Sequence, residues 1–459
     1  MNNTQKLEFN KKININFEWW EITWNAWMLL FEEFCNKMNI LPLLEEYLPE
    51  IRKGNLDHIK SEIIYQKIFR IISWITSNNN YVFQKQDPVF QEIHNNKIAS
   101  SATCSRLENT FNYSDVSNLR KVQLKLEEYN LLQTKPEEMI VDIDTTNDPA
   151  SENLEFARFN GHYGLNGFSP IVAFNWINGD FLRWFLKPWN YYCSTLSYNF
   201  ILDLIKFYQE KEIKNISFRL DSAFWNPKIY ELFEENLVDY YIKLKANSAL
   251  YSKVKWKWIR WISTFEEFEY QAQSWNKPRR VIACIDWKQN KNQQELFPTY
   301  SFIITNNKIL SKEEVFSMYN WRATIEKSIE EWKNWFEMDH LSHKDFRVNS
   351  TIFQIHLLAI QIAQLFRKFC LSKVNTVIQS ETKFQESKKI TKKFKKQKVW
   401  RKQINLPSIS TIRKQLLCIS AKIVRTWRQI YYKCASSFIF KKLFMNTLER
   451  VQNLDPLII

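Results

Sequence analysis

The sequence predicts a mixed α/β protein in which a core of strands and helices is flanked by helical regions on both sides. Three observations predict this class. Residues 1 to about 135 carry apolar side chains at the three and four spacing of helices. Short β-rich runs begin near residue 136, with one helical stretch between the second and the third run. Helical periodicity resumes near residue 311, so we expect an α/β core with at least one parallel pair of strands.

Length, composition and charge bound the class of protein. The 459 residues suffice for about two or three domains with a sizeable core. Hydrophobic residues make up 45% and aromatic residues 16% of the chain, which is typical of a folded globular protein. Lysine and arginine total 64 against 49 acidic residues, a formal charge of +15. Such an excess favours a polyanionic partner, most commonly nucleic acid.

Simple patterns argue against a disulfide-rich, a zinc-ribbon and a membrane protein. The seven cysteines are scattered without a C-x-x-C pair, which fits a reducing cytoplasm. The first residues lack the apolar stretch of a signal peptide. The most apolar long segment starts at Thr351 and is interrupted by Gln354, His356 and two further glutamines. We therefore expect a packed helix there and not a membrane span.

The α/β core is predicted from four segments in the middle of the chain. Residues 137–146, 168–187 and 214–224 are short runs rich in β-branched and aromatic side chains, which predicts strands. Residues 194–211 have helical periodicity and separate the second run from the third. A strand, a helix and a further strand in this order predict parallel pairing.

A second group of strands follows without a long helix between its members. It comprises residues 238–247, 265–275, 279–287 and 299–307. We interpret this block as a β-rich insertion in the core. Helical periodicity resumes after it, over residues 311–336.

A basic segment lies near the end of the chain. Residues 388–403 contain nine lysines and arginines and no acid. This composition predicts a flexible linker that contacts phosphates without sequence preference. The alternative is a solvated tail without a dedicated partner. Helical sequence follows to residue 459.

Acidic residues stand where two of the predicted strands end. Asp142 and Asp144 lie two residues apart, so both point to the same face of a strand, and Asp221 follows another strand directly. Such positions present carboxylates at the edge of a sheet and not in its core. A plain turn aspartate is the alternative for each one alone. Asp144, Asp221 and Glu326 would together supply three carboxylates, which are the oxygen ligands that Mg²⁺ binds.

The stretch "YNWRATIEKSIEEWK", residues 319–333, sets polar groups at regular intervals. In one continuous helix, four of them would fall within about 60° around the axis. They are Tyr319, Arg322, Glu326 and Lys333. One explanation is a solvated face with an Arg322–Glu326 pair. The other is a functional face, whose Glu326 would join the aspartates around two divalent ions about 4 Å apart and promote phosphodiester displacement.

These motifs resemble those of a known family. The residues "DTT" at 144–146, "RLDSAF" at 219–224 and the spacing Y-(2)-R-(3)-E-(6)-K at 319–333 together resemble the bacterial insertion-sequence DDE transposases with a Y-R-E-K signature. More closely, the chain is similar to the family typified by insertion sequence thirteen-eighty. Further counterparts extend the likeness almost from end to end, namely "ITWNAWMLLFEEF", "DPVF", "SRLEN", "MDHLSHKDFRVN" and "SAKIVRTWR".

The resemblance implies an RNase H-like catalytic core that is interrupted by a β-rich insertion and flanked by helical N-terminal and C-terminal regions. The expected order is a helical DNA-binding region, the first part of the core, the insertion, the second part of the core with the Y-R-E-K helix, and a basic linker with a helical C-terminal region. These parts correspond to residues 1–135, 136–235, 236–310, 311–375 and 376–459.

The resemblance also implies an activity. A DNA transposase would bind the terminal inverted repeats of its element, cleave at the element ends and transfer the 3′ hydroxyl strand to target DNA. Asp144, Asp221 and Glu326 are the expected catalytic residues and the ligands of two Mg²⁺ ions, or of Mn²⁺ in their place. Asp142 and Glu330 are the alternatives for the first and the third ligand.

The remaining expectations concern partners and competing functions. Tyr319, Arg322 and Lys333 are expected to contact phosphates of the transposon end, and the protein is expected to associate with itself in a synaptic complex. Such a protein acts in the cytoplasm, at the nucleoid, and not at a membrane. Two other functions stay open: a catalytically inactive or repurposed DNA-binding relic, and a metal-dependent nuclease without strand transfer.

Glycine is unusually scarce. Only five glycines occur where an average usage of about 7% predicts roughly 32, whereas tryptophan occurs 19 times. The resemblance implies glycine at several tryptophan positions, namely Trp27, Trp74, Trp189, Trp332, Trp335 and Trp427. We hypothesise that the source organism reads the UGA codon as glycine and that these tryptophans result from translating it as tryptophan. The alternative is a chain in which UGA does encode tryptophan.

Overall fold

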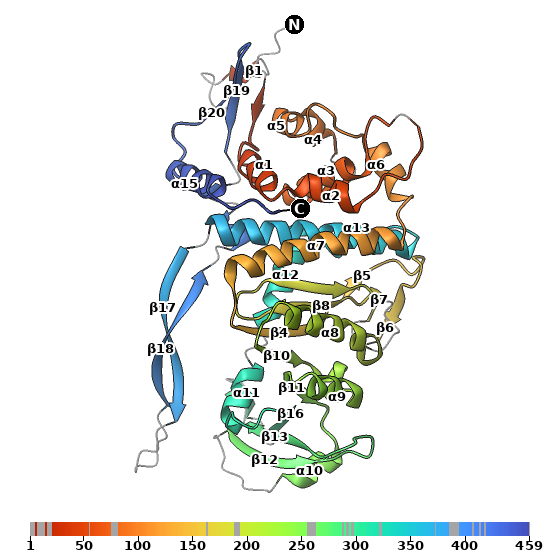
Figure 1. Cartoon of the computed structure of the whole chain (residues 1–459), viewed down its shortest axis with the longest axis vertical. Helices are drawn as coiled ribbons and strands as arrows, with labels where there is room; N and C mark the ends of the chain where they lie inside the picture. Colours follow the sequence, from red (N-terminus) through yellow and green to blue (C-terminus); the bar gives the residue numbers. More distant parts are fainter. Residues whose placement is uncertain are drawn as a thin grey trace. The chain divides into compact units, whose positions relative to one another are not determined.

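The computed structural model describes most of the chain (Figure 1). The described residues are 5–6, 14–15, 21–54, 56–74, 81–161, 164–187, 193–254, 263–286, 289–290, 293–294, 298–320, 324–371, 373–384, 394–405, 408–412, 415–416 and 419–458. The chain divides into two compact units. One is Phe111–Gln361, and the other combines Met1–Thr110 with Ile362–Ile459.

An eight-stranded mixed sheet forms the centre of the unit Phe111–Gln361, with its strands in the order β12-β13-β16-β11-β10-β4-β8-β9. The central strands β4, β10 and β11 run parallel. The strands β8 and β9 on one side, and β16, β13 and β12 on the other, pair antiparallel. The bounds are β4 Glu138–Thr145, β8 Ile171–Asn175, β9 Phe181–Phe185, β10 Asn215–Leu220, β11 Asp239–Leu244, β12 Thr264–Tyr270, β13 Arg279–Asp286 and β16 Thr299–Thr305.

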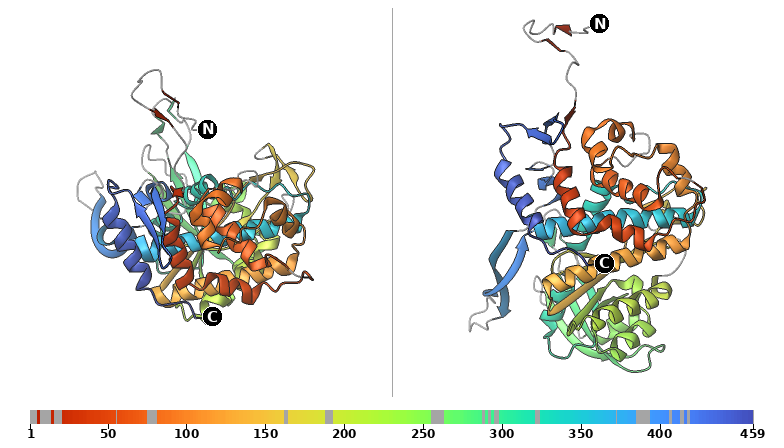
Figure 2. Two further views of the ribbon diagram at one scale, coloured as in Figure 1. Left: turned by 90° about the horizontal axis from the view of Figure 1, so that it is seen from above. Right: turned by 45° about the horizontal axis from the view of Figure 1, so that its top comes forward.

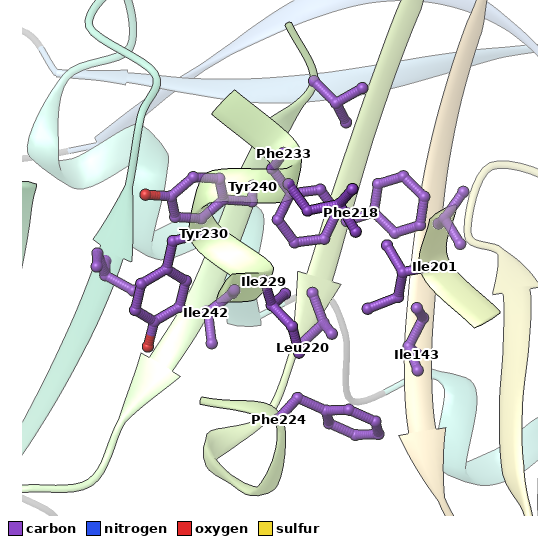
Figure 3. Packing of buried hydrophobic residues seen from close by; sticks show 14 of the residues in the cluster. Ile143, Ile201, Phe218, Leu220, Phe224, Ile229, Tyr230, Phe233, Tyr240 and Ile242 are labelled. Atoms are coloured by element: carbon purple, nitrogen blue, oxygen red, sulfur yellow. The ribbon is translucent and has the colours of Figure 1, made fainter. Parts of the chain in front are cut away.

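Two helices, α8 (Cys193–Glu210) and α9 (Pro227–Glu235), cover one face of this sheet. Alternate residues of each strand point to that face, and Ile143, Leu220 and Ile242 of the three parallel strands enter one apolar core with both helices. Figure 3 shows strand residues packed beside side chains of α8 and α9. The parallel strands read as almost continuous apolar runs because they are buried on both faces.

The opposite face is covered by α11 (Lys312–Asn320) and α12 (Thr324–Phe336). Trp332 of α12 contacts Phe174 of β8, with ring centroids 4.8 Å apart. Val315 of α11 packs in a second apolar cluster with residues of β11, β13 and β16. These strand residues alternate with those of the first core, so both helices lie on the other side of the sheet.

Two long helices, α7 (Tyr113–Thr134) and α13 (Phe346–Phe366), lie side by side (Figure 1), and α13 belongs to this unit as far as Gln361. The side-chain amide of Gln354 donates to the side chain of Gln123, and that of Gln361 donates to the backbone carbonyl of Gln123 at 3.1 Å. The helix α7, which the sequence groups with the N-terminal region, therefore packs with the second half of the core.

Shorter elements complete the unit. They are β5 Asp148–Pro149, β6 Arg158–Asn160, β7 Leu165–Phe168, the 3-10 helix η2 Ser222–Phe224, α10 Ser248–Lys253, β14 Gln289–Asn290 and β15 Gln293–Gln294. The strands β5, β7 and β6 form a small sheet of their own, in the order β5-β7-β6.

The other unit is helical in its N-terminal part and mixed in its C-terminal part. The N-terminal elements are β1 Gln5–Lys6, β2 Asn14–Ile15, β3 Ile22–Thr23, α1 Met28–Lys37, α2 Ile40–Tyr47, α3 Lys60–Ile72, α4 Tyr81–Gln86, α5 Pro88–Ile93 and α6 Ser101–Glu108. The C-terminal elements are the π-helix η4 Arg367–Leu371, β17 Lys373–Phe384, β18 Phe394–Asn405, α14 Ile409–Ile412, β19 Ala421–Arg425, β20 Ile430–Cys434 and α15 Lys441–Gln452. Across the described residues, no helix has the length and hydropathy to cross a membrane.

The C-terminal region differs from its prediction. A flexible linker was expected over residues 388–403, but residues 394–403 belong to β18, which pairs with β17 in a two-stranded hairpin (Figure 2). Residues 388–393 lie outside the described part. The hairpin forms because residues 373–384 are rich in valine, isoleucine and threonine and offer the basic segment a partner strand. The strands β19 and β20 likewise add a sheet to a region expected to be helical.

Two further expectations are refined. The strands expected over residues 236–310 are present, and β11, β16, β13 and β12 extend the same eight-stranded sheet. The helix expected over residues 311–336 is described as two helices, α11 and α12. Residues 321–323 between them lie outside the described part.

Candidate active site

Two aspartates stand next to each other at the carboxyl ends of β4 and β10. These strands are parallel neighbours whose register pairs Ile143 with Leu220. The next residues are Asp144 and Asp221, and continuing the register places both on the face of the sheet that α11 and α12 cover. Carboxyl ends of parallel strands are where α/β sheets present functional groups. The structure thus brings two of the three predicted catalytic acids together at the carboxyl end of the sheet's parallel strands.

Each of these carboxylates is oriented by a backbone amide. Oδ1 of Asp144, which is 9% exposed, accepts a hydrogen bond from the amide of Thr145 at 2.8 Å. Oδ1 of Asp221 accepts from the amide of Ala223 at 2.8 Å and caps the 3-10 helix η2. A hydrogen bond from a backbone amide helps to hold a carboxylate in one rotamer. Charged carboxylate oxygens are the donors that a hard divalent cation takes.

Asp142 forms an ion pair with an arginine of the neighbouring strand. Arg219 of β10 donates from Nε to Oδ1 and from Nη2 to Oδ2 of Asp142, both at 2.6 Å, and neither side chain is more than 1% exposed. Arg219 also donates to the carbonyl of Met318 at 2.6 Å and lies 4.7 Å from the ring centroid of Trp176. Both oxygens of Asp142 are therefore used by a buried ion pair. This pair favours Asp144 as the first metal ligand.

Arg219 was not singled out from the sequence, although a signal was present. The residue stands inside the motif "RLDSAF", two positions before Asp221 and hence on the same strand face. In parallel neighbouring strands, an acid and a base on the same face at matched positions predict a cross-strand ion pair. The register of β4 and β10, which pairs Asp142 with Arg219, was the missing information.

The helix α12 carries the third predicted acid. Glu326 lies in its first turn and is exposed, as is its alternative Glu330 one turn later. Lys333 follows Glu326 by seven residues, about two turns, and therefore lies on the same side of the helix. The ammonium group of Lys333 donates to the backbone carbonyl of Asn147 and, at 3.0 Å, to its side-chain oxygen. Since Asn147 follows Asp144 by three residues, this contact ties α12 to the end of β4.

The three predicted acids are not gathered into a closed ligand set. In the described part of the chain, no three histidine, cysteine, aspartate or glutamate side chains stand close enough to hold a metal ion. Asp144 and Asp221 are brought together by strand pairing, whereas Glu326 stays on the exposed part of α12.

The other two residues of the Y-R-E-K set are separated from this arrangement. Tyr319 belongs to α11, where it is partly buried and packs against the apolar cluster of Tyr241, Ile303 and Val315. Arg322 lies outside the described residues. The single helical face predicted for the four side chains is therefore observed only for Glu326 and Lys333.

One further acid, which follows β4, was not singled out from the sequence. Asp148 is fully buried, and neither of its carboxyl oxygens has a hydrogen-bond partner within the described residues. Burial raises its pKa well above the ordinary value, the charge of Asp339 raises it further, and Lys333 opposes the shift. Burial lowers the pKa of Lys333, which Asp339 and Asp148 oppose. The only sequence signal was the acid in "DTTND", which reads as a turn residue.

Comparison with known proteins identifies a protein family that the chain matches. The chain matches the family model described as "Transposase DDE domain group 1" over residues 5–383. A search of curated proteins finds no match.

Two solved structures are similar in part. One is a piggyBac transposase synaptic complex with hairpin DNA, which is 9% identical with a TM-score of 0.40 over 74% of this chain and 75% of that chain. The other is a Mos1 transposase paired-end complex with the left transposon end, 13% identical with a TM-score of 0.17 over 42% of this chain and 60% of that chain. At these scores the structures add no argument to the family match.

Proposed function

Because the chain belongs to the DDE transposase family, we propose that it is a DNA transposase that binds the terminal inverted repeats of its own element. It cleaves at the element ends and transfers the 3′ hydroxyl strand to target DNA. The observation that carries the proposal is the placement of Asp144 and Asp221 side by side at the carboxyl ends of two parallel strands. The closer assignment to the family typified by insertion sequence thirteen-eighty rests on the sequence motifs and is part of the proposal.

An RNase H-like core is part of the same proposal. The first strand of the core, β4, is central, with the antiparallel pair β8 and β9 on one side and the parallel strands β10 and β11 on the other. Helices cover both faces. This order brings the ends of β4 and β10 together at a point where a ligand crevice is expected. The strand order thus supports a core whose first two acids come from non-consecutive strands.

We assign the metal-binding role to Asp144, Asp221 and Glu326, with Mg²⁺, or Mn²⁺ in its place, as the two-ion cofactor. Two bound ions would activate the attacking oxygen and stabilise the leaving oxygen of a phosphodiester. The chain's own contribution is to hold Asp144 and Asp221 by backbone amides and to present Glu326 from the first turn of α12. Glu326 is proposed to complete the ligand set when DNA and ions bind.

The DNA partner is proposed from charge and from the Y-R-E-K residues. The formal charge of +15 favours a polyanion such as double-stranded DNA over an uncharged or basic partner. Tyr319, Arg322 and Lys333 are assigned to phosphates of the transposon end, and the helices of residues 1–110 to the inverted repeats. The protein would associate with itself in a synaptic complex, because it has to join two ends of one DNA element. It would act at the nucleoid, in the cytoplasm, because its substrate is DNA.

A DNA-binding relic is the competing function. The relic is disfavoured because Asp144, Asp221 and Glu326 are all present. In addition, the carboxylates of Asp144 and Asp221 each accept a hydrogen bond from a backbone amide. The test is to incubate the wild-type protein with Mg²⁺ and labelled DNA from the flanks of its gene. The Asp221→Asn variant is incubated in parallel as the control. Cleavage at the element boundary that the variant loses supports the enzyme, and binding without cleavage by the wild type supports the relic. Cleavage without joined products would indicate a plain nuclease.

A further inference from the structure

The excess positive charge of the chain lies in one segment. Residues 387–448 contain 17 lysines and arginines and no aspartate or glutamate. The rest of the chain holds 47 lysines and arginines against 49 acids, so the whole excess comes from residues 387–448. Residues 1–110, with their helices, hold 12 lysines and arginines against 13 acids. By charge, a polyanion is therefore attracted to the C-terminal segment and not to the N-terminal helical region.

A described part of this segment forms the hairpin of β19 and β20. The strand β19 also pairs with β3, which gives a three-stranded sheet in the order β20-β19-β3. Arg425 of β19 donates from Nε to Oε1 of Glu21 at 3.2 Å and from Nη1 to Oε2 of Glu92 at 3.0 Å. These bonds tie the hairpin to the residue before β3 and to α5, so the hairpin is part of the folded unit.

The three-stranded sheet has one buried face and one exposed face. Ala421 and Ile423 of β19 point to the buried face and are 2% and 3% exposed. Lys422, between them, points to the other face, and the register places it directly opposite Lys433 of β20. Residues opposite each other in an antiparallel pair lie on the same face, and both lysines are exposed. Together with Tyr431, which lies two residues from Lys433 and is 46% exposed, they form the basic face of this sheet.

A further cation stands in the turn between β19 and β20. The amide of Thr426 donates to the carbonyl of Gln429 at 2.9 Å, and the amide of Gln429 donates to Oγ1 of Thr426 at 3.0 Å. All four residues of this turn are exposed, so Arg428 presents its charge at the tip of the hairpin. The neighbouring Trp427, which would be glycine under the recoding hypothesis, is not required for this placement.

The shape and the charge of the hairpin fit duplex DNA. The major groove of B-form DNA admits a two-stranded β-ribbon, whereas the major groove of an RNA duplex is deep and narrow. Lysine and arginine side chains on such a ribbon reach phosphates, which contribute affinity and carry no sequence information. These properties indicate a surface for DNA of any sequence.

We propose that the basic face, together with Arg428, is a DNA-binding surface that holds the phosphates of duplex DNA without sequence preference. The choice of DNA as the polyanion rests on the proposed function. A surface of this kind suits target DNA, to which a transposase joins its element, and does not select the inverted repeats.

The experiment measures binding of the full chain to two labelled duplexes without Mg²⁺, over a range of salt concentrations. One duplex comes from the flanks of the gene, and the other is unrelated to it. The test variant is Arg428→Gln with Lys433→Gln. The matched control is Lys214→Gln with Lys308→Gln, which removes the same charge from two exposed lysines of the unit Phe111–Gln361. A rescue variant, Arg428→Lys with Lys433→Arg, keeps both charges.

The expected result separates this surface from the overall charge of the protein. The test variant should bind both duplexes about tenfold more weakly and should reduce the salt slope of log K by about two, roughly one for each lost phosphate contact. The control should stay within about twofold of the wild type, since screened charges far from the DNA contribute little. The rescue variant should restore the wild-type slope. Melting temperatures should not differ, because the substituted side chains are exposed.

Four results would overturn the proposal. A test variant with the wild-type salt slope would remove the basic face from DNA binding, and equal losses in the test and control variants would reduce the effect to overall charge. A loss for the flanking duplex alone would mark a sequence-specific contact. Tighter binding of the wild type to duplex RNA than to duplex DNA would assign the surface to RNA.

The experiment also keeps this proposal apart from the proposed function. If the wild type binds the unrelated duplex but does not cleave the flanking duplex when Mg²⁺ is added, the proposed function fails, while the salt titration still decides the surface. Should the test variant not fold, Lys433→Gln alone decides, with an expected reduction of the slope by about one.

Discussion

Arg219 and Asp142 form a two-bond ion pair inside the sheet, with Nε to Oδ1 and Nη2 to Oδ2 both at 2.6 Å. A third bond from Arg219, to the carbonyl of Met318, attaches the end of α11 to the same pair at 2.6 Å. The pair therefore joins β4, β10 and α11 directly beside the two strand-end aspartates. It gives Asp142 a structural role, next to the proposed catalytic role of Asp144.

The first prediction concerns this pair. Asp142→Asn should lower the free energy of unfolding by about 3–5 kcal/mol, because Arg219 would remain buried without its counter-charge. Urea denaturation of the full chain measures the change. The exposed pair of Arg347 and Asp345 is the control, and Asp345→Asn should cost at most about 1 kcal/mol. Normal stability of Asp142→Asn together with lost cleavage would instead make Asp142 the metal ligand.

The second prediction separates catalysis from DNA binding. Asp144→Asn and Asp221→Asn should each lower the cleavage rate by about a hundredfold or more, the scale on which one electrostatic stabiliser acts. Affinity for end DNA should not fall, since neither change removes a positive charge. Single-turnover cleavage and a gel-shift titration give the two quantities. A variant that keeps the wild-type cleavage rate would remove its residue from the proposed ligand set.

The third prediction distinguishes the two acids of α12. Glu326 and Glu330 are both exposed and stand one turn apart, so Glu326→Gln and Glu330→Gln should be equally stable. Only Glu326→Gln should lose metal-dependent cleavage, by about a hundredfold or more. Cleavage assays over a range of Mg²⁺ concentrations make the comparison. The reverse pattern would assign the third ligand to Glu330.

The fourth prediction is a pH dependence of stability. Burial raises the pKa of Glu127 on α7 from 4.5 to about 7, against the charge of Arg183 and the hydroxyl of Tyr208, which donates to the carboxylate. Between these two values the folded state holds a proton that the unfolded chain has lost. Stability should therefore fall as the pH rises through this window, by up to about 3 kcal/mol.

Variants of Glu127 and its partner test this assignment. Glu127→Gln should flatten the dependence of the unfolding free energy on pH between 4.5 and 7. Tyr208→Phe should steepen it, because it removes a hydrogen bond that lowers the pKa of Glu127. Urea unfolding at several pH values measures the slopes. Equal slopes in the wild type and Glu127→Gln would refute the role of this carboxyl group.

The fifth prediction concerns the genetic code of the source. Trp74 follows the C-cap Ser73 of α3 and has φ 58°, the left-handed conformation in which glycine is the usual residue after a helix. The other described positions of the set, Trp27, Trp332, Trp335 and Trp427, do not have positive φ, and Trp189 lies outside the described residues. Sequencing of native peptides should find glycine at position 74, and tryptophan there would end the hypothesis.

Much of the sheet could be predicted because its strands are specified locally. The uninterrupted apolar runs of β4, β10 and β11 follow from burial on both faces, and the helix between β9 and β10 follows from its own periodicity. The hairpin of β17 and β18 could not be predicted in this way. Its basic strand lacks a strong strand signal of its own, and the pairing partner supplies the reason for its conformation.

By itself the sequence determined the α/β class, the order of the main strands and helices, and the presence of acids where β4 and β10 end, because apolar periodicity and turn residues act over a few neighbours. Only the tertiary structure decided that Asp142 pairs with Arg219, 77 residues away, and that Lys333 reaches Asn147 across 186 residues. These contacts depend on the register between β4 and β10 and on the docking of α12. Both are settled by packing of the whole sheet, and neither is encoded in any short stretch of the chain.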